Sequence, residues 1–363
     1  MLEKTDPAAL ERLALATLPT LQHPNGIFCF DRTEGGPLRG ESVRYTLMVR
    51  LGLQRATDAG VAPARLDPLV VDLVHSGAYQ RTPGDLGLLL WSDLRDGDDR
   101  AEEVLTQLRS ELDVPDAMVG LEGMEIGWMG MGLAEAARAE LPDAVQLLQR
   151  VLDHLLVDRR GRSGLYRHRL DSRVRQELPN FATEVYSLLL LARVAALDLD
   201  PRAEAAAVAL GAQLIEHRRA DGGWPWLYDA TSGRVVEPYE IYSVHQDAMA
   251  PMAFFELTEA TGDPRWADAA VVGFPYGFGE NELGLSFYDD DAPFAHRSIR
   301  RRQPWAKVAT TGRALTERIT GQRLPVPTRV ELNRTCRPYH LGWVLEAWSG
   351  REHLAHGDSG HPG

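Results

Sequence analysis

The sequence predicts an all-α protein, an (α/α)6-type toroid of helical hairpins with long loops at one mouth. Apolar residues recur at three- and four-residue spacing along most of the 363-residue chain. The predicted helices are of two alternating kinds, one with a charged face and one apolar on all sides. Strand-like alternation is confined to short pieces such as 26–30 and 233–237.

Six of the predicted helices are nearly apolar all round and hold polar or aromatic residues in their first turn. They begin near Glu41, Asp85, Glu125, Asn180, Tyr242 and Tyr339. A helix that is apolar on every side must be buried, so these six form an inner layer, and helices such as 142–157 and 201–218 form an outer layer. The inner helices then point the same way, and their N-termini meet at one mouth. A helical repeat solenoid is the alternative architecture.

We expect a single domain over 1–363, with a loop-rich insertion at about 273–300, a helix at 305–321 and a disordered tail at 350–363. The net charge of −13 argues against a general nucleic-acid binder. No apolar run approaches the roughly 20 residues that span a bilayer. The N-terminus lacks the features of a signal peptide, and two cysteines cannot form a disulfide framework. These features predict a cytoplasmic protein.

The segment 240–255, EIYSVHQDAMAPMAFF, crowds Tyr242, His245, Gln246 and Asp247 into one turn of an apolar helix. Pro251 cannot donate a hydrogen bond to the carbonyl of Asp247, so we expect the regular helix to begin only around 246–248. His245 and Asp247 would then share one face of an extended segment. We predict that Tyr242, His245 and Asp247 form the catalytic centre, and that Asp247 raises the pKa of His245. The alternative is that His245 braces a neighbouring loop.

The other inner starts supply further candidates. Glu125 and Glu184 are the remaining candidate catalytic residues. The candidate substrate-binding residues at these starts are Arg44, Trp128, Asn180, Arg337, Tyr339 and His340. The alternatives are an ion pair for Arg44, a plain N-cap for Asn180, and helix packing for the glycines at 127, 130 and 132.

Two loops are candidate substrate walls. Segment 221–229 holds Trp224 and Trp226 beside two glycines and a proline, and Tyr239 follows as a further binding residue. Aromatic rings on loops are suited to stacking on sugars, although such rings also fill cores. The run Asp289-Asp290-Asp291 could hold a proton or a cation, or it could be a solvated loop.

The helical hairpins, together with IGWMGMGLAEA (126–136) and DGGWPW (221–226), resemble the six-hairpin toroid enzymes that act on carbohydrates. Residues 127–133 resemble the Gly-Trp-x-x-x-Gly-Leu helix of unsaturated glucuronyl hydrolases, whose catalytic aspartate has no clear match here. The Gly-Gly-Trp loop resembles squalene-cyclase-like terpenoid cyclases, whose Asp-x-Asp-Asp motif is replaced by Tyr288-Asp289-Asp290-Asp291. Lanthionine cyclases share the toroid and bind zinc, and Cys336 and His340 have the i,i+4 spacing of ligands.

The resemblance and the candidate residues together predict a carbohydrate-active enzyme, a hydrolase, lyase or epimerase acting on a glycan or a uronate-containing sugar. The expected substrate is a small molecule or an oligosaccharide, and no cofactor or metal is expected. A terpenoid-cyclase-like enzyme or isomerase with an aromatic cavity is one alternative. A non-catalytic toroid that binds a glycan or a partner protein is the other.

Overall fold

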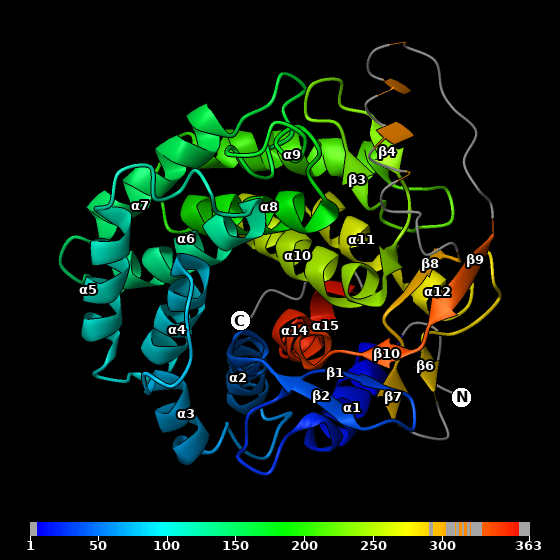
Figure 1. The fold of residues 1–363 in the computed structure, drawn as a ribbon, viewed down its shortest axis with the longest axis horizontal. Helices are drawn as coiled ribbons and strands as arrows, with labels where there is room; N and C mark the ends of the chain where they lie inside the picture. Colours follow the sequence, from blue (N-terminus) through cyan, green and yellow to red (C-terminus); the bar gives the residue numbers. More distant parts are fainter. Residues whose placement is uncertain are drawn as a thin grey trace.

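The protein is a ring of helical hairpins (Figure 1). The computed structural model describes residues 6–289, 293–302, 309, 312–313, 316–317, 320 and 329–355. The predicted helix at 305–321 lies almost wholly outside the described residues. No helix in the described ranges is long and apolar enough to cross a membrane.

Six inner helices form a closed ring. They are α2 (Val43–Asp58), α4 (Pro83–Asp96), α6 (Gly123–Arg138), α8 (Phe181–Ala196), α10 (Ala250–Thr261) and α14 (Pro338–Trp348). Each contacts the next, and α14 contacts α2, which closes the ring. All six start within a few residues of the predicted positions, except that a π-helical turn, His245–Met249, precedes α10.

The outer layer consists of helices that lie beside the inner ones. It contains α1 (Pro7–Thr17), α3 (Pro68–His75), α5 (Ala101–Leu112), α7 (Ala144–Asp153), α9 (Ala203–His217) and α11 (Arg265–Val271). Helices α5, α7, α9 and α11 each pack on the inner helix that precedes them, and α1 packs on α14. A 3-10 turn (Leu18–Leu21) follows α1, and a π-helical turn (His154–Asp158) follows α7. The predicted (α/α)6 toroid is confirmed.

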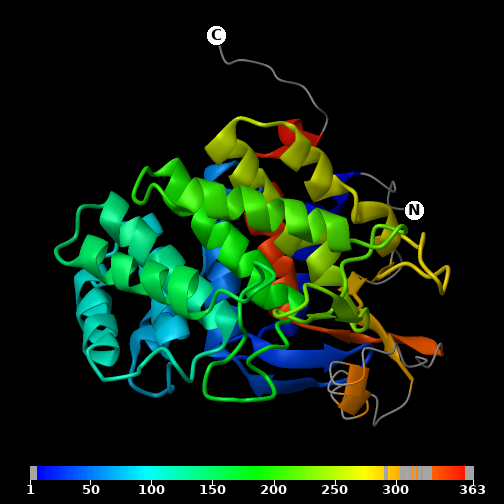
Figure 2. The same cartoon turned by 90° about the horizontal axis from the view of Figure 1, so that it is seen from above.

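Short antiparallel strands precede several inner helices (Figure 2). One sheet joins β10 (Thr335–Cys336), β1 (Cys29–Thr33) and β2 (Leu38–Glu41). A second joins β5 (Ile241–Tyr242), β8 (Ser298–Arg301) and β9 (Val330–Asn333). Strands β2, β10 and β5 run directly into the starts of α2, α14 and the His245 turn, so backbone pairing fixes where these helices begin. A further pair, β3 (Leu227–Tyr228) and β4 (Val235–Glu237), contains part of the predicted 233–237 strand.

The expected insertion at 273–300 is more regular than a loop. It contains the short helix α12 (Phe274–Gly277), the pair β6 (Tyr288–Asp289) and β7 (Phe294–Ala295), and β8. The tail is also ordered further than expected, because α15 (Glu352–Ala355) follows Arg351, a buried residue that ion-pairs with Glu256. Residues 356–363 lie outside the described residues.

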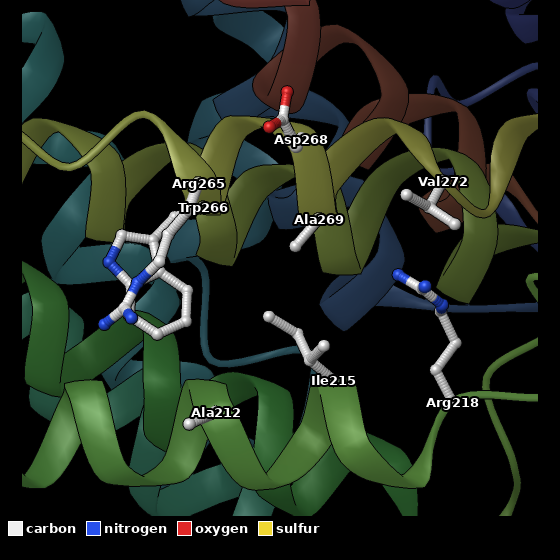
Figure 3. Close-up of a pocket in the computed structure, with 8 residues that line it drawn as sticks. All are labelled: Ala212, Ile215, Arg218, Arg265, Trp266, Asp268, Ala269 and Val272. Atoms are coloured by element: carbon white, nitrogen blue, oxygen red, sulfur yellow. The ribbon is translucent and has the colours of Figure 1, made fainter.

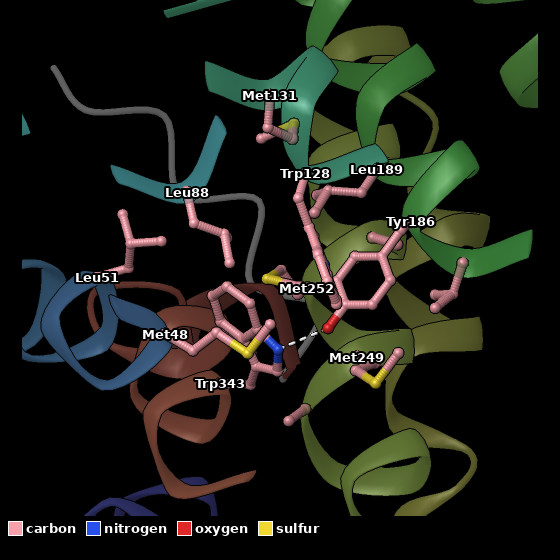
Figure 4. Packing of buried hydrophobic residues seen from close by; sticks show 14 of the residues in the cluster. Met48, Leu51, Leu88, Trp128, Met131, Tyr186, Leu189, Met249, Met252 and Trp343 are labelled. Atoms are coloured by element: carbon pink, nitrogen blue, oxygen red, sulfur yellow. Dashed lines mark hydrogen bonds between the residues drawn. The ribbon is translucent and has the colours of Figure 1, made fainter. Parts of the chain in front are cut away.

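The centre of the ring is filled by side chains. Figure 4 shows Trp343 of α14 and Tyr186 of α8 meeting there, with the Trp343 indole donating to the Tyr186 hydroxyl at 2.6 Å. Methionines and leucines of the surrounding inner helices, including Met48, Met131 and Met252, complete this buried cluster. The inner helices therefore share one apolar core, as their all-round apolar sequences predict.

Inner helices touch through their backbones at glycines. A Cβ added to Gly52 in α2 would lie 2.1 Å from the carbonyl oxygen of Gly342 in α14. A Cβ on Gly132 in α6 would lie 2.2 Å from the carbonyl oxygen of Gly87 in α4. Because real side chains do not approach a backbone so closely, only glycine permits these two contacts.

Ion pairs join the C-terminal halves of the inner helices. Arg193 of α8 pairs with Glu135 of α6 and Glu256 of α10. Arg95 of α4 pairs with Glu346 of α14 at 2.6 Å. These carboxylates and guanidinium groups neutralise one another between inner helices, so their charges are balanced at the C-terminal end of the ring.

We predict that Gly52→Ala lowers the free energy of unfolding by about 1–3 kcal/mol, because the new methyl group forces α2 away from α14. Gly77→Ala, in the turn after α3, is the control, since no atom lies within 4 Å of its added Cβ and alanine there should not destabilise the protein. Urea unfolding of both variants measures the difference, and equal stability of the two would contradict the backbone contact.

Candidate functional site

The N-terminal turns of the inner helices and the loops before them gather at one face of the ring, which we call the mouth. His245 lies there, three per cent exposed, in the turn that starts α10. Its imidazole packs against the rings of Phe181 (4.7 Å between centroids), Tyr242 (4.9 Å) and Trp226 (5.9 Å). The Nδ1 atom is enclosed without a hydrogen-bond partner in the described chain. His245 is thus a ring held by aromatic neighbours rather than by hydrogen bonds.

The π-helical turn at His245–Met249 has a local cause. Pro251 has no N–H to give to the carbonyl of Asp247, so regular winding cannot continue there. The Asp247 carbonyl instead accepts a hydrogen bond from the Trp348 indole at 2.6 Å. The sequence predicts the orphaned carbonyl, and the structure provides its donor.

Asp247 pairs with His340 rather than with His245. Its Oδ2 accepts from His340 Nε2 at 2.7 Å and from the Tyr288 hydroxyl. His340 Nδ1 lies 3.3 Å from the hydroxyl of Ser243, and that hydroxyl donates to the carbonyl of Arg297 at 3.1 Å. Each ring nitrogen of His340 therefore faces an oxygen atom, Nε2 the carboxylate of Asp247 and Nδ1 the hydroxyl of Ser243.

The predicted rise in the pKa of His245 is wrong in direction. Burial, and after it the positive charges of His340 and Arg297, together lower this pKa to about 3. Asp247, the expected cause of a rise, is turned toward His340 on α14. His245 is therefore a neutral imidazole at physiological pH.

Arg44, Glu125 and Trp128 form a second group at the mouth. Arg44 donates to Asp85 at 2.5 Å and to Glu125 at 3.3 Å, and its guanidinium lies 5.0 Å from the centre of the Trp128 ring. Glu125 also accepts from the backbone N–H of Glu122, which completes the capping box of α6. The contacts of Arg44 are therefore those of the ion-pair alternative. Arg44 and Glu125 both have partners within the fold.

Glu184 and Asn180 serve the start of α8. Glu184 is fully buried, and its two oxygens accept from the backbone N–H of Tyr166 at 3.0 and 3.2 Å. Burial raises the pKa of Glu184 well above its usual value. Asn180 is the N-cap of α8 and accepts from Thr183 N–H at 2.8 Å, which matches its plain structural alternative.

The two tryptophans expected to form a wall differ in position. Trp224 is fully buried and stacks between Phe181 (5.3 Å) and Phe254 (5.6 Å), so it belongs to the core. Trp226 is only half-buried and lies almost parallel to the His245 ring, with 12° between the planes. On a regular extended segment residues two apart would share one side, so the different burial of the two rings comes with the irregular, bent backbone of this loop. Trp226 is the one available to a ligand.

Tyrosines and arginines occupy the side of the mouth nearest α14. Arg337 donates to the Tyr45 hydroxyl at 2.7 Å, and the Tyr45 and Tyr339 rings lie 4.7 Å apart. Arg297 lies 5.1 Å from the centre of the Tyr242 ring. Burial raises the pKa of Tyr45 to about 12, and the neighbouring Tyr339 adds to this, although three arginines oppose it.

Tyr239 lies partly buried beside β5. Its hydroxyl contacts Glu282 and accepts from Arg219 at 3.2 Å, and Arg301 lies 4.9 Å from its ring centre. Burial and then the hydrogen bond to Glu282 raise the pKa of Tyr239 to about 12. Arginine partners therefore hold this ring in place.

Sequence reasoning missed several residues of the mouth. Arg297 and Tyr288 lie in the segment expected to be loops, and Ser243 was not distinguished from its neighbours. His168 was also missed: its Nδ1 lies 2.7 Å from Thr183 Oγ1 and its Nε2 lies 2.8 Å from Arg175. No local pattern marks His168, because its segment, 159–180, lies between predicted helices.

Three groups of side chains in the chain are of the types that bind metals. Cys336 lies in β10, before α14 begins, so the i,i+4 geometry of a helix does not apply to Cys336 and His340. Asp289 ends β6, whereas Asp290 and Asp291 lie outside the described residues. Ligand atoms of His75, Asp93 and Asp98 lie within 4.8 Å of one another, but Arg50 and Arg100 already ion-pair with the two carboxylates.

Comparison with known proteins identifies the fold. No family model matches the chain, and no curated protein does. A sugar epimerase from a ruminal bacterium is similar in structure (10% identity, TM-score 0.64, covering 96% of this chain and 99% of that one). The cellobiose 2-epimerase of Bacillus thermoamylovorans is also similar (11%, 0.66, 95% and 99%), as is a glycosidase (14%, 0.54, 94% and 95%). This chain shares their fold. These neighbours support the six-hairpin toroid and do not extend the resemblance to glucuronyl hydrolases or terpenoid cyclases.

We predict that Trp224→Ala lowers the free energy of unfolding by about 3–5 kcal/mol, as loss of a core aromatic does. Trp226→Ala should cost less than half as much, because Trp226 is only half-buried. Urea unfolding of both variants tests this difference. A larger loss for Trp226→Ala would show that the two positions are exchanged.

We predict that His245→Gln makes the protein less sensitive to acid. Between pH 6.5, the ordinary pKa, and about 3, the unfolded state binds a proton at His245 that the folded state does not. Wild-type stability therefore falls with decreasing pH by about 1.4 kcal/mol per unit from this group alone. Unfolding free energies at pH 4 to 7 should show a shallower slope for His245→Gln than for His353→Gln, a substitution at an exposed residue of α15. Parallel slopes would mean that His245 is charged when folded.

Proposed function

We propose that the protein is a carbohydrate-active enzyme that moves a proton at the carbon next to a sugar carbonyl, as an epimerase or isomerase does. Its substrate is a sugar with a free reducing end, which presents an aldehyde when its ring is open. His245 takes the proton from C2, and the electron pair of the broken C–H bond forms an enediolate. Return of a proton to the other face of C2 gives the epimer, and its return to C1 gives the ketose.

The observation that carries the proposal is the position of His245 at the mouth, where aromatic rings enclose its imidazole. A general base has to be neutral, and burial keeps His245 neutral at physiological pH. Trp226 and Tyr242 pack on this imidazole. Aromatic faces of this kind suit the C–H faces of a sugar ring.

His340 supports the same chemistry through its position. Asp247 and Ser243 contact its two ring nitrogens and orient the ring, and a positive charge on His340 lowers the pKa of His245. Such a charge beside the base would stabilise the negative charge that develops on the enediolate oxygen. Asp247 then acts as a positioning residue for His340.

Glycoside hydrolysis fits the mouth less well. It requires two carboxylates that flank the scissile bond. Glu184 is fully buried on a backbone N–H, Glu125 pairs with Arg44, and Asp247 pairs with His340. The three carboxylates expected to catalyse hydrolysis are thus all engaged inside the fold. The names of the two epimerases of similar fold agree with this choice of reaction class.

Proton transfer is tested by deuterium exchange. We predict that the protein in D2O incorporates deuterium at C2 of a reducing sugar from a panel that includes glucose, mannose and cellobiose, followed by proton NMR. His245→Gln should reduce the exchange rate by about 100-fold or more, whereas His353→Gln should leave it unchanged.

Two outcomes would contradict this function. Release of new reducing ends from oligosaccharides without exchange would indicate a hydrolase. Binding of sugars with neither reaction would indicate a non-catalytic toroid.

A further inference from the structure

Two arginines at the mouth are not held in ion pairs. Neither Arg297 nor Arg337 forms a salt bridge within the described chain, although both are only partly exposed and the charge of Glu240 acts on Arg297. The Nε atom of each is enclosed and has no hydrogen-bond partner there. Other shielded arginines are more fully engaged: Arg301 pairs with Glu237 at 2.6 Å, Arg351 pairs with Glu256 at 2.8 Å, and Arg159 donates to backbone carbonyls.

The two arginines come from different elements, and each contacts an aromatic ring of the mouth. Arg297 lies between β7 and β8, with its guanidinium over the Tyr242 ring. Arg337 is the residue before α14, and its guanidinium lies 4.3 Å from the ring centre of Phe30. Tyr45 accepts from Arg337, and the charges of both arginines act on it. Tyr45 therefore lies near both guanidinium groups.

A shielded guanidinium without a directly paired carboxylate is costly, because the contacts it has gained do not replace all of the water that it has lost. Aromatic faces supply part of the stabilisation, which leaves the N–H donors to be satisfied. An anion with planar or tetrahedral oxygens fits such donors, since arginine binds carboxylate and phosphate groups through paired hydrogen bonds. The first turn of α14, directly after Arg337, adds the positive end of a helix dipole.

We propose that Arg297 and Arg337 bind an anionic group of the substrate, a carboxylate or a phosphate, so that the substrate is an acidic or phosphorylated sugar. This inference rests on the proposed function, because it assigns the anion to the sugar that His245 acts on. The Tyr242 ring contacts His245 at 4.9 Å and Arg297 at 5.1 Å. Both groups therefore lie beside one ring, so an anion bound by Arg297 would hold the sugar close to the base.

Calorimetric titration with matched sugars tests the anion site without requiring turnover. Glucose, glucuronate and glucose 6-phosphate differ at one position, and inorganic phosphate alone serves as a fourth probe. We expect at least one of the anionic sugars to bind about 10-fold or more tightly than glucose. The two anionic arms distinguish a carboxylate site from a phosphate site.

Arg297→Gln and Arg337→Gln should each remove most of that preference and leave the affinity for glucose nearly unchanged. Arg300→Gln is the matched control, because Arg300 is exposed on β8 and pairs with Glu331. The lysine substitutions Arg297→Lys and Arg337→Lys should restore part of the preference, and they keep the test usable if a glutamine variant does not fold.

The outcomes separate the two proposals. Tight, arginine-dependent binding of an anionic sugar without deuterium exchange would support the anion site and contradict the epimerase function. Exchange on glucose with no preference for either anionic sugar would support the function and overturn the anion site. An equal loss of affinity in Arg300→Gln, or no binding of any anionic sugar, would also overturn it.

Discussion

Close backbone contact between neighbouring inner helices is the constraint on which the rest of the structure depends. Gly52 and Gly342 bring α2 and α14 together, and Gly87 and Gly132 do the same for α4 and α6. At this separation the ring is narrow enough for Trp343 and Tyr186 to meet across its centre. The same contact sets the helix starts side by side. The polar first turns therefore converge on one face, where residues from distant parts of the chain share partners.

The chemistry of the mouth follows from which polar groups found partners and which did not. Asp247, Glu125 and Glu184 are each held by hydrogen bonds or ion pairs within the fold, although Oδ1 of Asp247 is enclosed without a partner in the described chain. His245 is enclosed by rings instead, and burial keeps its pKa low. Arg297 and Arg337 likewise meet rings rather than carboxylates. The residues left over are a neutral base and two cations, a combination that suits an electron-rich, acidic ligand.

Local sequence predicted the positions of the inner helices well, and it predicted poorly which polar side chains pair with one another. All-round apolar character with a polar first turn located the six inner starts, because burial demands that pattern whatever the neighbours are. Pro251 revealed the orphaned carbonyl of Asp247, since that effect acts within one turn. Trp348, which donates to this carbonyl, lies 101 positions along the chain, and His340, which pairs with the Asp247 carboxylate, lies 93 positions along it. No periodicity carries such information. The different burial of Trp224 and Trp226 has a similar origin, because both were predicted to line the site and only distant partners such as Phe254, which stacks on Trp224, place one of them in the core.

The contact between α2 and α14 also governs when the ring can form. Arg337 and Tyr45 are 292 positions apart, so the junction joins the beginning of the chain to its end. During synthesis the N-terminal helices emerge first, and the sides of α2 and α10 that α14 covers stay exposed to water until the last inner helix leaves the ribosome. The growing chain is thus an open arc with two apolar edges. A product that ends before residue 337 would keep those edges, and it would be prone to aggregation or capture by chaperones.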